Sequence, residues 1–314
     1  MKFSVFQVSR QGGRKSNEDR MGYCYTRDCV LLMLADGMGG HPEGEVAARL
    51  TMETVASLFN ERAQPKLADV ADFLSDAMMA AHRQILQYAF GKAMSDSPRT
   101  TLVVAVIQSG QVSWSHCGDS RFYLVRQQQL LTRTQDHSFL AHSHRHHQAQ
   151  HPAGLNRNVL FTCLGSPTRP VFSVNKPLLL QQDDKLMLCS DGLWASLPEQ
   201  DIVNELSLKP VDQAVPDLVN NALHHGGDRG DNVTCLALAW HSAGLLAPTN
   251  TPTASQNTHD GNFGATLPAP ESAFAQEAPI ELDEQGMDRA VAEINTTIRL
   301  SAIKKASSSL QPKP

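Results

Sequence analysis

The chain contains no apolar run long enough to cross a membrane. A membrane-spanning helix needs about 18 or more apolar residues in succession, whereas the longest run here, VLLMLA at residues 30–35, has the length of a buried strand. The N-terminal segment MKFSVFQVSRQGG also lacks the apolar core of a secretory signal peptide. We therefore expect neither a membrane span nor a signal peptide.

Cysteine pairs and an excess of basic charge are missing as well. None of the six cysteines belongs to a C-x-x-C pair, and several lie inside apolar runs, where a free cysteine behaves as a small hydrophobe. This pattern argues against a zinc site or a disulfide framework and favours a reducing cytoplasm. The net charge of −5 argues against a nucleic-acid-binding protein, which would have a broad basic character.

The composition changes near residue 241. Residues 1–241 are predicted to form one dense domain, which a chain of 314 residues can accommodate. Residues 242–282 are rich in Pro, Ala, Thr, Ser and Gly and are predicted to be a disordered linker, because they cannot bury enough apolar area to offset their ordering entropy. Residues 283–306 carry an apolar stripe at helical spacing, which predicts either a transient helix or a docking helix. Residues 307–314 are expected to be a disordered tail.

Within the domain, short apolar runs separated by turn residues predict many strands, with helices grouped in blocks. Gly110 in QSGQ indicates a hairpin between two of the strands. Because helices and strands do not alternate strictly, the order indicates an α+β architecture built on antiparallel sheets. Helices are predicted at residues 43–63, 67–90, 199–206 and 212–224. Strands are predicted at residues 3–8, 21–26, 30–35, 101–108, 111–117, 121–125, 185–189 and 233–240.

Four aspartates lie beside turns that adjoin these strands. Asp36 ends VLLMLAD, Asp191 ends KLMLCSD, and Asp231 precedes VTCLALAW. Asp19 lies in NED, before the short run MGYCY. Carboxylates at strand ends can converge at one edge of a sheet, and a carboxylate cluster with few His or Cys partners suits hard divalent cations such as Mg²⁺ or Mn²⁺. Each of these turns, taken singly, is explained equally well by structure alone.

Five short motifs surround these aspartates. The arginine of the first motif, RKSNED, can hold two phosphate oxygens in a planar fork, although this motif also fits a charged surface turn. The glycines of the second let a backbone carbonyl approach an ion, although they also fit a strand–turn–helix connection. No Gly-Lys-Ser/Thr follows them, which excludes a P-loop. The motifs are RKSNED (14–19), DGMGGH (36–41), GDSR (118–121), SDGLW (190–194) and GDNVT (230–234).

Together and in this order, the motifs resemble those of the protein phosphatase 2C family of metal-dependent Ser/Thr phosphatases. The matching segments are RxxNED, DGMGG, GDSR, DHS at 136–138, SDG and DN. The resemblance covers residues 1 to about 241. DGMGGH resembles the bacterial branch of the family. The resemblance implies a four-layer αββα sandwich, in which two antiparallel sheets are flanked by helix pairs. It also implies two Mn²⁺ or Mg²⁺ ions that activate water for hydrolysis of phosphoserine and phosphothreonine monoesters, with no side-chain nucleophile.

The resemblance also implies roles for individual metal ligands. Asp36 would bridge the two ions, and the carbonyl of Gly37 would bind one of them. Asp191 and Asp231 would complete the other ion. Asp119 resembles the ligand of a third, weaker ion.

The same resemblance implies supporting residues and reveals one departure. Glu18 and Asp19 would ligate directly or hold metal-bound waters, and Arg14 would clamp the substrate phosphate. In eukaryotic members a histidine directly follows DG, but here Met38 takes that position. His41 is the nearest candidate to contact the substrate or protonate the leaving group. The alternative is a metal-bound water as the acid, with His41 structural at the start of the helix.

A second departure is the His-rich segment at residues 137–151, which holds six of the thirteen histidines. In bacterial relatives, the corresponding segment resembles a mobile flap that covers the site. Three interpretations remain open: solvated polar residues, a pH-sensitive flap, or a metal site.

The expected partners are phosphorylated proteins and a cognate bacterial Ser/Thr kinase, and the chain is expected to be a cytoplasmic monomer. Two other functions are compatible with the same fold: a pseudophosphatase that recruits a partner through its tail, and a hydrolase of small phosphomonoesters. Degenerate family members lose metal carboxylates, whereas Asp36, Asp191 and Asp231 are all present beside Arg14. The ligand set therefore favours the enzyme.

Overall fold

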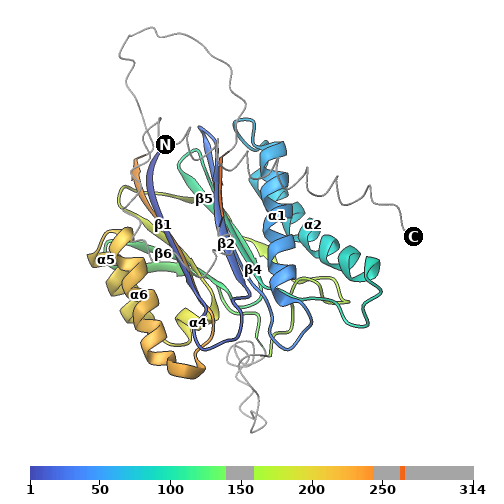
Figure 1. Cartoon of the computed structure of the whole chain (residues 1–314). Coiled ribbons are helices and arrows are strands. Elements are labelled where there is room, and N and C mark those ends of the chain that lie inside the picture. Colours follow the sequence, from blue (N-terminus) through green and yellow to red (C-terminus); the bar gives the residue numbers. More distant parts are fainter. Residues whose placement is uncertain (139–158, 243–261, 266–314) are drawn as a thin grey trace, which may run out of the picture. The chain divides into compact units, whose positions relative to one another are not determined.

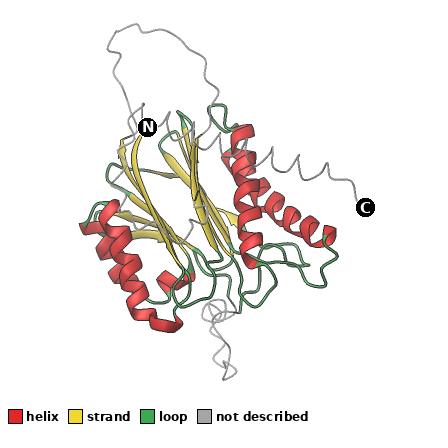
Figure 2. Cartoon of the chain, viewed as in Figure 1, coloured by secondary structure: helices red, strands yellow, loops and turns green. Residues whose placement is uncertain are grey.

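Two β-sheets lie face to face in the middle of the molecule, and helices cover the outer face of each sheet (Figures 1 and 2). The computed structural model describes residues 1–138, 159–242 and 262–265. Neighbouring strands are antiparallel in both sheets. The αββα sandwich predicted for this chain is therefore confirmed.

The first sheet has the strand order β1-β11-β10-β6-β7. Its edge strand β7 was not predicted, because its five residues QLLTR are only partly buried and carry a weak apolar pattern. The strands are β1 (Lys2–Arg10), β11 (Val233–Ser242), β10 (Lys185–Cys189), β6 (Arg121–Arg126) and β7 (Gln129–Arg133).

The second sheet has the order β12-β2-β3-β4-β5-β8, with β9 also paired to β5. The predicted hairpin is present: Gln108 pairs with Gln111, and Ser109 and Gly110 between them have φ of 55° and 73°. Two positive φ values are typical of the tight turns that join twisted strands. The strands are β12 (Asn262–Ala265), β2 (Asp19–Tyr25), β3 (Cys29–Asp36), β4 (Leu102–Gln108), β5 (Gln111–Cys117), β8 (Ser173–Val174) and β9 (Leu178–Leu179).

Strand β12 lies inside residues 242–282, which were predicted to be a disordered linker. Its four residues pair with the edge of β2 from Gly22 to Tyr25. An edge strand offers unpaired backbone groups to any extended segment, so this pairing requires no apolar sequence pattern. The composition of the segment therefore did not reveal it.

Four long helices form the two outer layers. Helices α1 and α2 cover the second sheet, whereas α5 and α6 cover the first (Figure 1). All four begin and end within a few residues of the predicted limits. Two elements of one turn, α4 and η1, were not predicted. The helices are α1 (Gly44–Arg62), α2 (Val70–Gly91), α4 (Asp191–Trp194), α5 (Glu199–Leu208), α6 (Val211–Gly226) and the 3₁₀ helix η1 (Gly227–Arg229).

Strand β3 shows how the layers are held together. Leu32 and Leu34 face the core between the sheets, whereas Leu31 and Met33 face the core beneath α1 and α2. All four side chains are fully buried. Burial on both faces explains why the sequence of this strand is a continuous apolar run without alternation. Each such side chain stabilises the fold by roughly 1.5–3 kcal/mol.

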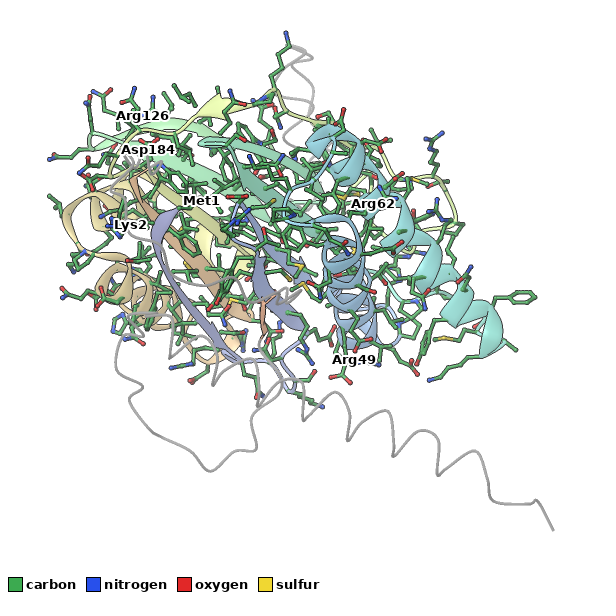
Figure 3. The ribbon with its side chains drawn as sticks, turned by 90° about the horizontal axis from the view of Figure 1, so that it is seen from above. Met1, Lys2, Arg49, Arg62, Arg126 and Asp184 are labelled. Carbon is green, nitrogen blue, oxygen red and sulfur yellow. The ribbon has the colours of Figure 1, made fainter. Side chains whose placement is uncertain are left out.

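An ion pair with a buried carboxylate joins the end of β6 to the residue that precedes β10. Asp184, which is fully buried, accepts hydrogen bonds from Nε and Nη2 of Arg126 at 2.8 and 2.7 Å. Figure 3 shows the two residues side by side, on the opposite side of the molecule from Arg62. Because both carboxylate oxygens are paired, this charge can be buried without a large penalty.

Among the described residues, no helix has the length and apolar character that a membrane crossing requires. All six cysteines are buried and carry free thiols, which agrees with the expectation of no disulfide framework. The segments 283–306 and 307–314, and residues 139–151 of the His-rich segment, lie outside the described residues.

Candidate active site

The ends of both sheets bring the predicted carboxylates together. In the second sheet, Asp19 at the start of β2 pairs with Asp36 at the end of β3. In the first sheet, Asp191 begins α4 after β10, and Asp231 precedes β11. A pocket of about 540 Å³ lies at this junction. The predicted site residues that line it are Arg14, Glu18, Asp36, Gly37, Asp119, Asp191 and Asp231.

Burial and mutual repulsion raise the pKa values of Asp36 and Asp191 in this cluster. Burial raises the pKa of Asp36 well above its usual value, and the charges of Asp19 and Asp191 raise it further. Burial likewise raises the pKa of Asp191, followed by the charges of Asp119 and Asp231. The site therefore holds more negative charge than its own cations compensate.

Two neighbouring carboxylates each keep an oxygen without a partner. Asp19 is 2% exposed and lies behind the pocket wall, where Ser190 Oγ donates to its Oδ2 at 2.8 Å. Its Oδ1 and the Oε2 of Glu18 are buried and have no hydrogen-bond partner among the described residues. Burial raises the pKa of Asp19 to about 6 and also raises the pKa of Glu18. Buried acceptors of this kind are costly unless a cation or water satisfies them.

The residues of this pocket fit divalent cations. Hard cations prefer carboxylate, carbonyl and water oxygens, and the pocket supplies the first two in excess. No three Asp, Glu, His or Cys side chains within the described ranges form a complete metal-binding group by themselves. Magnesium-type centres retain several waters, so an incomplete side-chain set suits them.

Glycine is required at the turn after β3. A Cβ on Gly37 would lie 2.6 Å from the backbone of Gly44 and 2.8 Å from the carbonyl oxygen of Glu18. A Cβ on Gly44 would in turn lie 2.3 Å from Oε2 of Glu18. The turn can therefore pack against the Glu18 backbone only because Gly37 lacks a side chain, whereas a Cβ on Gly44 would meet the flexible end of the Glu18 side chain. This close approach holds the Gly37 backbone at the pocket wall.

Arg14 lies at the mouth of the pocket and is about half exposed. Its Nη2 donates to Oδ2 of Asp231 at 2.6 Å. This hydrogen bond and the charge of Asp231 raise the pKa of the guanidinium. The residue predicted to clamp a phosphate thus directly contacts one of the predicted metal ligands.

His41 does not line the pocket. Its Nδ1 lies 2.9 Å from Oδ2 of Asp96, and its backbone N–H donates to the carbonyl of Met38. The hydrogen bond from His41 lowers the pKa of Asp96. Of the two roles expected for His41, this geometry supports the structural one.

Three polar residues that sequence reasoning passed over hold the carboxylates in place. Asn232 accepts from the backbone N–H of Glu18 at 2.8 Å and donates to two carbonyls of the segment between β1 and β2. Thr101 Oγ1 accepts from the N–H of Asp36 at 3.1 Å. The third is Ser190, described above. Asn232 and Ser190 stand beside the DN and SDG aspartates, so the motifs contain the signal for both residues.

Asp119 is positioned from a third direction. Its carbonyl accepts from Nε1 of Trp194 at 3.0 Å, which ties the strand end before β6 to α4. Burial raises the pKa of its carboxyl to about 6, and the charge of Asp136 adds to this effect. Asp119 is therefore part of the acidic cluster that lines the pocket.

The chain is similar to known bacterial serine/threonine phosphatases. The serine/threonine phosphatase stp of Listeria welshimeri is 30% identical over 238 residues, which cover 74% of this chain and 93% of that protein. The serine/threonine protein phosphatase PstP of Mycobacterium tuberculosis is 30% identical over 235 residues, which cover 70% of this chain and 41% of that protein.

Solved structures show the same fold. Serine/threonine phosphatase Stp1 from Staphylococcus aureus superposes with a TM-score of 0.68 at 27% identity, covering 77% of this chain and 96% of that one. The catalytic domain of PstP, solved in complex with 2 manganese ions, has a TM-score of 0.62 at 27% identity and covers 77% of this chain and 100% of that one. Residues 7–224 match the family model described as Protein phosphatase 2C, and the chain belongs to that family.

Proposed function

We propose that this chain is a phosphoprotein phosphatase that hydrolyses phosphoserine and phosphothreonine with two bound Mn²⁺ or Mg²⁺ ions. The observation that carries the proposal is the convergence of Asp36, Asp119, Asp191 and Asp231 in one pocket with Arg14 at its mouth. The names of the relatives, which are Ser/Thr phosphatases, support the same reaction.

Four of the pocket residues would hold the two ions. Asp36, the Gly37 carbonyl, Asp191 and Asp231 would supply the oxygen ligands for them. When bound, the ions lower the pKa of a water molecule and neutralise phosphoryl charge. Asp36 ends β3, where its N–H donates to Thr101 Oγ1, and Asp191 begins α4, so the fold sets the backbone position of both residues.

The other acidic residues support this centre. Glu18 and Asp19 would ligate directly or hold metal-bound waters, since each has a buried oxygen that lacks a partner among the described residues. Asp119, which lies between β5 and β6, would bind a third, weaker ion.

Arg14 would orient the substrate phosphate. A guanidinium can bind two oxygens of a phosphate at once, which fixes the direction of the ester bond as well as its charge. The Asp231 carboxylate holds this guanidinium at the pocket mouth in the absence of substrate. A phosphate that takes over this contact would leave Asp231 available to a cation.

The leaving alkoxide needs a proton, and the two candidate donors are His41 and a water held at the metal site. Met38 cannot supply it, and His41 is engaged with Asp96 outside the pocket lining. We therefore assign His41 the structural role, in which it holds the glycine turn against the loop after α2, and a water held at the metal site would be the remaining candidate donor.

The setting of the enzyme is a separate proposal. We infer a cytoplasmic monomer that acts on phosphorylated proteins and opposes a Ser/Thr kinase. Buried free thiols suit a reducing compartment. We keep residues 1–241 as the catalytic domain, with 242–282 as a linker that includes β12, 283–306 as an amphipathic helix and 307–314 as a tail.

The test is hydrolysis of p-nitrophenyl phosphate and of a phosphothreonine peptide with and without Mn²⁺. We expect activity with Mn²⁺, none after EDTA treatment, and none in Asp36→Asn. Glu53→Gln, a change on the exposed face of α1, is the control and should match the wild type. Activity that survives complete removal of metal would overturn the proposal.

A further inference from the structure

A lysine without a charged partner among the described residues lies at the mouth of the active-site pocket. Arg14 and Lys15 are the basic residues that line this pocket, which also contains five carboxylates. Arg14 is engaged with Asp231, to which its Nη2 donates at 2.6 Å. Lys15 is exposed, and its ammonium forms no ion pair or hydrogen bond within the described part of the chain. Lys15 is therefore the basic residue at this mouth that remains available to a ligand.

Hydrogen bonds hold the backbone on both sides of Lys15. The carbonyl of Arg14 accepts from Nε2 of Gln11 at 2.6 Å. The carbonyl of Ser16 accepts from Nδ2 of Asn232 at 2.9 Å. Because both neighbours are fixed, the loop presents Lys15 at the pocket mouth, while the four-carbon stem lets the ammonium reach an anion in more than one position.

The segment packed against this loop adds a second basic residue. The N–H of Gly13 donates to the carbonyl of Gly230 at 2.9 Å, and a Cβ on Gly13 would lie 2.2 Å from the carbonyl oxygen of Asp228, so the two backbones are in direct contact. Arg229 is exposed and has no ion pair with any described residue. Asp228 is exposed beside it and offsets one charge, so Lys15 and Arg229 leave this side of the pocket mouth with an excess of positive charge.

Charge is distributed unevenly between the interior and the mouth of the pocket. Asp36 and Asp191 are shielded from solvent, since burial is the main cause that raises their pKa values, whereas Lys15 is exposed. Divalent cations would compensate the interior carboxylates, and the planar fork of Arg14 suits the phosphate itself. The compact ammonium of Lys15 has no such geometric requirement and can pair with a carboxylate. Lys15 therefore suits a second anionic group of the substrate.

We propose that Lys15 is a specificity-determining residue, which binds an acidic side chain of the phosphoprotein close in sequence to the phosphorylated residue. This inference rests on the proposed function. Arg14 and Lys15 are consecutive, and their Cα atoms are about 3.8 Å apart, so an anion bound by Lys15 lies near the phosphate bound by Arg14. The enzyme thus favours phosphorylation sites in acidic segments over those in basic segments, which the charge at the pocket mouth repels.

The experiment measures kcat/KM of the full chain with Mn²⁺ on a matched set of phosphothreonine peptides. Each peptide carries one variable residue, which is Glu, Gln or Lys, at one of the positions near the phosphothreonine in an otherwise Ala/Ser sequence. p-Nitrophenyl phosphate has no such residue and reports the reaction alone. At the position that Lys15 reaches, we expect the Glu peptide to exceed the Gln peptide by roughly 2- to 5-fold, the range of an exposed ion pair, and the Lys peptide to be the slowest.

Substitutions of Lys15 locate the preference. Lys15→Gln should bring the ratio of kcat/KM for the Glu peptide to that for the Gln peptide towards one, and Lys15→Arg should retain it. Lys15→Glu should invert the preference in favour of the Lys peptide. In the wild type the ratio should decline as NaCl is raised from about 0.05 to 0.5 M, because salt screens exposed charges. Lys66→Gln changes an exposed lysine between α1 and α2 that does not line the pocket, and it should keep the wild-type ratio.

The outcomes separate this inference from the proposed function. If the wild type hydrolyses p-nitrophenyl phosphate but treats the Glu, Gln and Lys peptides alike at every position, or if Lys15→Glu keeps the wild-type preference, the role of Lys15 is overturned and the phosphatase stands. An equal loss on every substrate in Lys15→Gln would place Lys15 on the reacting phosphate and would also overturn this role. If p-nitrophenyl phosphate is not hydrolysed, the proposed function fails, and the role of Lys15 fails with it.

Discussion

Arg121 and Asp136 form a bidentate ion pair in which guanidinium Nε and Nη2 each lie 2.7 Å from a carboxylate oxygen. Both side chains are 12% exposed. The guanidinium also lies 3.6 Å from the centre of the Trp194 ring, and Trp194 donates to the carbonyl of Asp119. The pair therefore joins the GDSR, DHS and SDG motifs and holds Asp119 against the helix that begins at Asp191.

Asp136→Asn should destabilise the fold strongly. The substitution keeps the shape of the side chain but leaves the Arg121 guanidinium without its counter-charge, and breaking a buried pair in this way costs about 3 kcal/mol. Urea unfolding in EDTA measures the loss. The matched control is Glu53→Gln, which breaks the exposed pair with Arg49 and should cost less than about 0.5 kcal/mol. Equal losses in the two variants would show that the buried pair does not organise the site.

Asp191→Asn should stabilise the metal-free protein while impairing its response to metal. In EDTA the variant removes one of several buried like charges, and Tm should rise on the order of 2–4 °C for each kcal/mol gained. With Mn²⁺ the wild type should gain stability through binding, and the variant should gain much less. Differential scanning fluorimetry in EDTA and in Mn²⁺ measures both effects. A lower Tm of the variant in EDTA would contradict the repulsion assigned to this cluster.

Gly37→Ala should cost about 1–3 kcal/mol, because the added Cβ would meet backbone atoms of Gly44 and Glu18, which cannot move aside as a flexible side chain can. Gly91→Ala is the control, since a Cβ at this last residue of α2 meets nothing within 4 Å. Urea unfolding compares the two variants. If Gly37→Ala were as stable as Gly91→Ala, the turn after β3 would not be as tightly packed as described.

His137 should make stability depend on pH. Burial is the main cause that lowers its pKa to about 4, followed by the neighbouring His116, whereas Asp136 acts in the opposite direction. Below the ordinary pKa of about 6.5, the unfolded chain binds a proton that the folded protein does not. The contribution of His137 is therefore complete above about pH 6.5 and is lost as pH falls towards about 4.

The test for His137 compares the wild type with His137→Phe, which keeps a ring against His116 but cannot titrate. Unfolding free energies between about pH 7 and pH 4.5 should fall less steeply in the variant. His225→Phe, on the exposed face of α6, is the control. Parallel curves for the wild type and His137→Phe would contradict the assignment.

Arg14→Lys should impair catalysis without affecting the fold. A lysine keeps the charge but not the planar fork, so kcat/KM on phosphopeptides should fall by roughly 10- to 100-fold. The ion pair with Asp231 is substantially exposed, so unfolding free energy should change by less than about 1 kcal/mol. Full activity in Arg14→Lys would remove Arg14 from the phosphate site.

Much of the fold follows from local patterns in the sequence. The apolar run before Asp36 and the helical spacing in α1 and α6 are set by residues close together in the chain, so the periodicity reveals them directly. The edge strands of the two sheets are harder to predict from the sequence. Strands β7 and β12 form mainly through backbone hydrogen bonds with a neighbour, and such pairing leaves little trace in composition.

The same distinction applies to the acidic cluster, in which part of the arrangement follows from the sequence and part only from the tertiary structure. The sequence by itself indicated Asp36, Asp191 and Asp231 as candidates, because each stands at a turn beside an apolar run and because the motifs in this order resemble those of a known family. Only the tertiary structure decided which groups hold them, since Ser190 reaches Asp19 and Asn232 reaches Glu18 across gaps of 171 and 214 residues. It likewise decided that Arg14 contacts Asp231 and that His41 turns to Asp96. Hydrogen bonds depend on distance in space, and no local pattern encodes a partner so far along the chain.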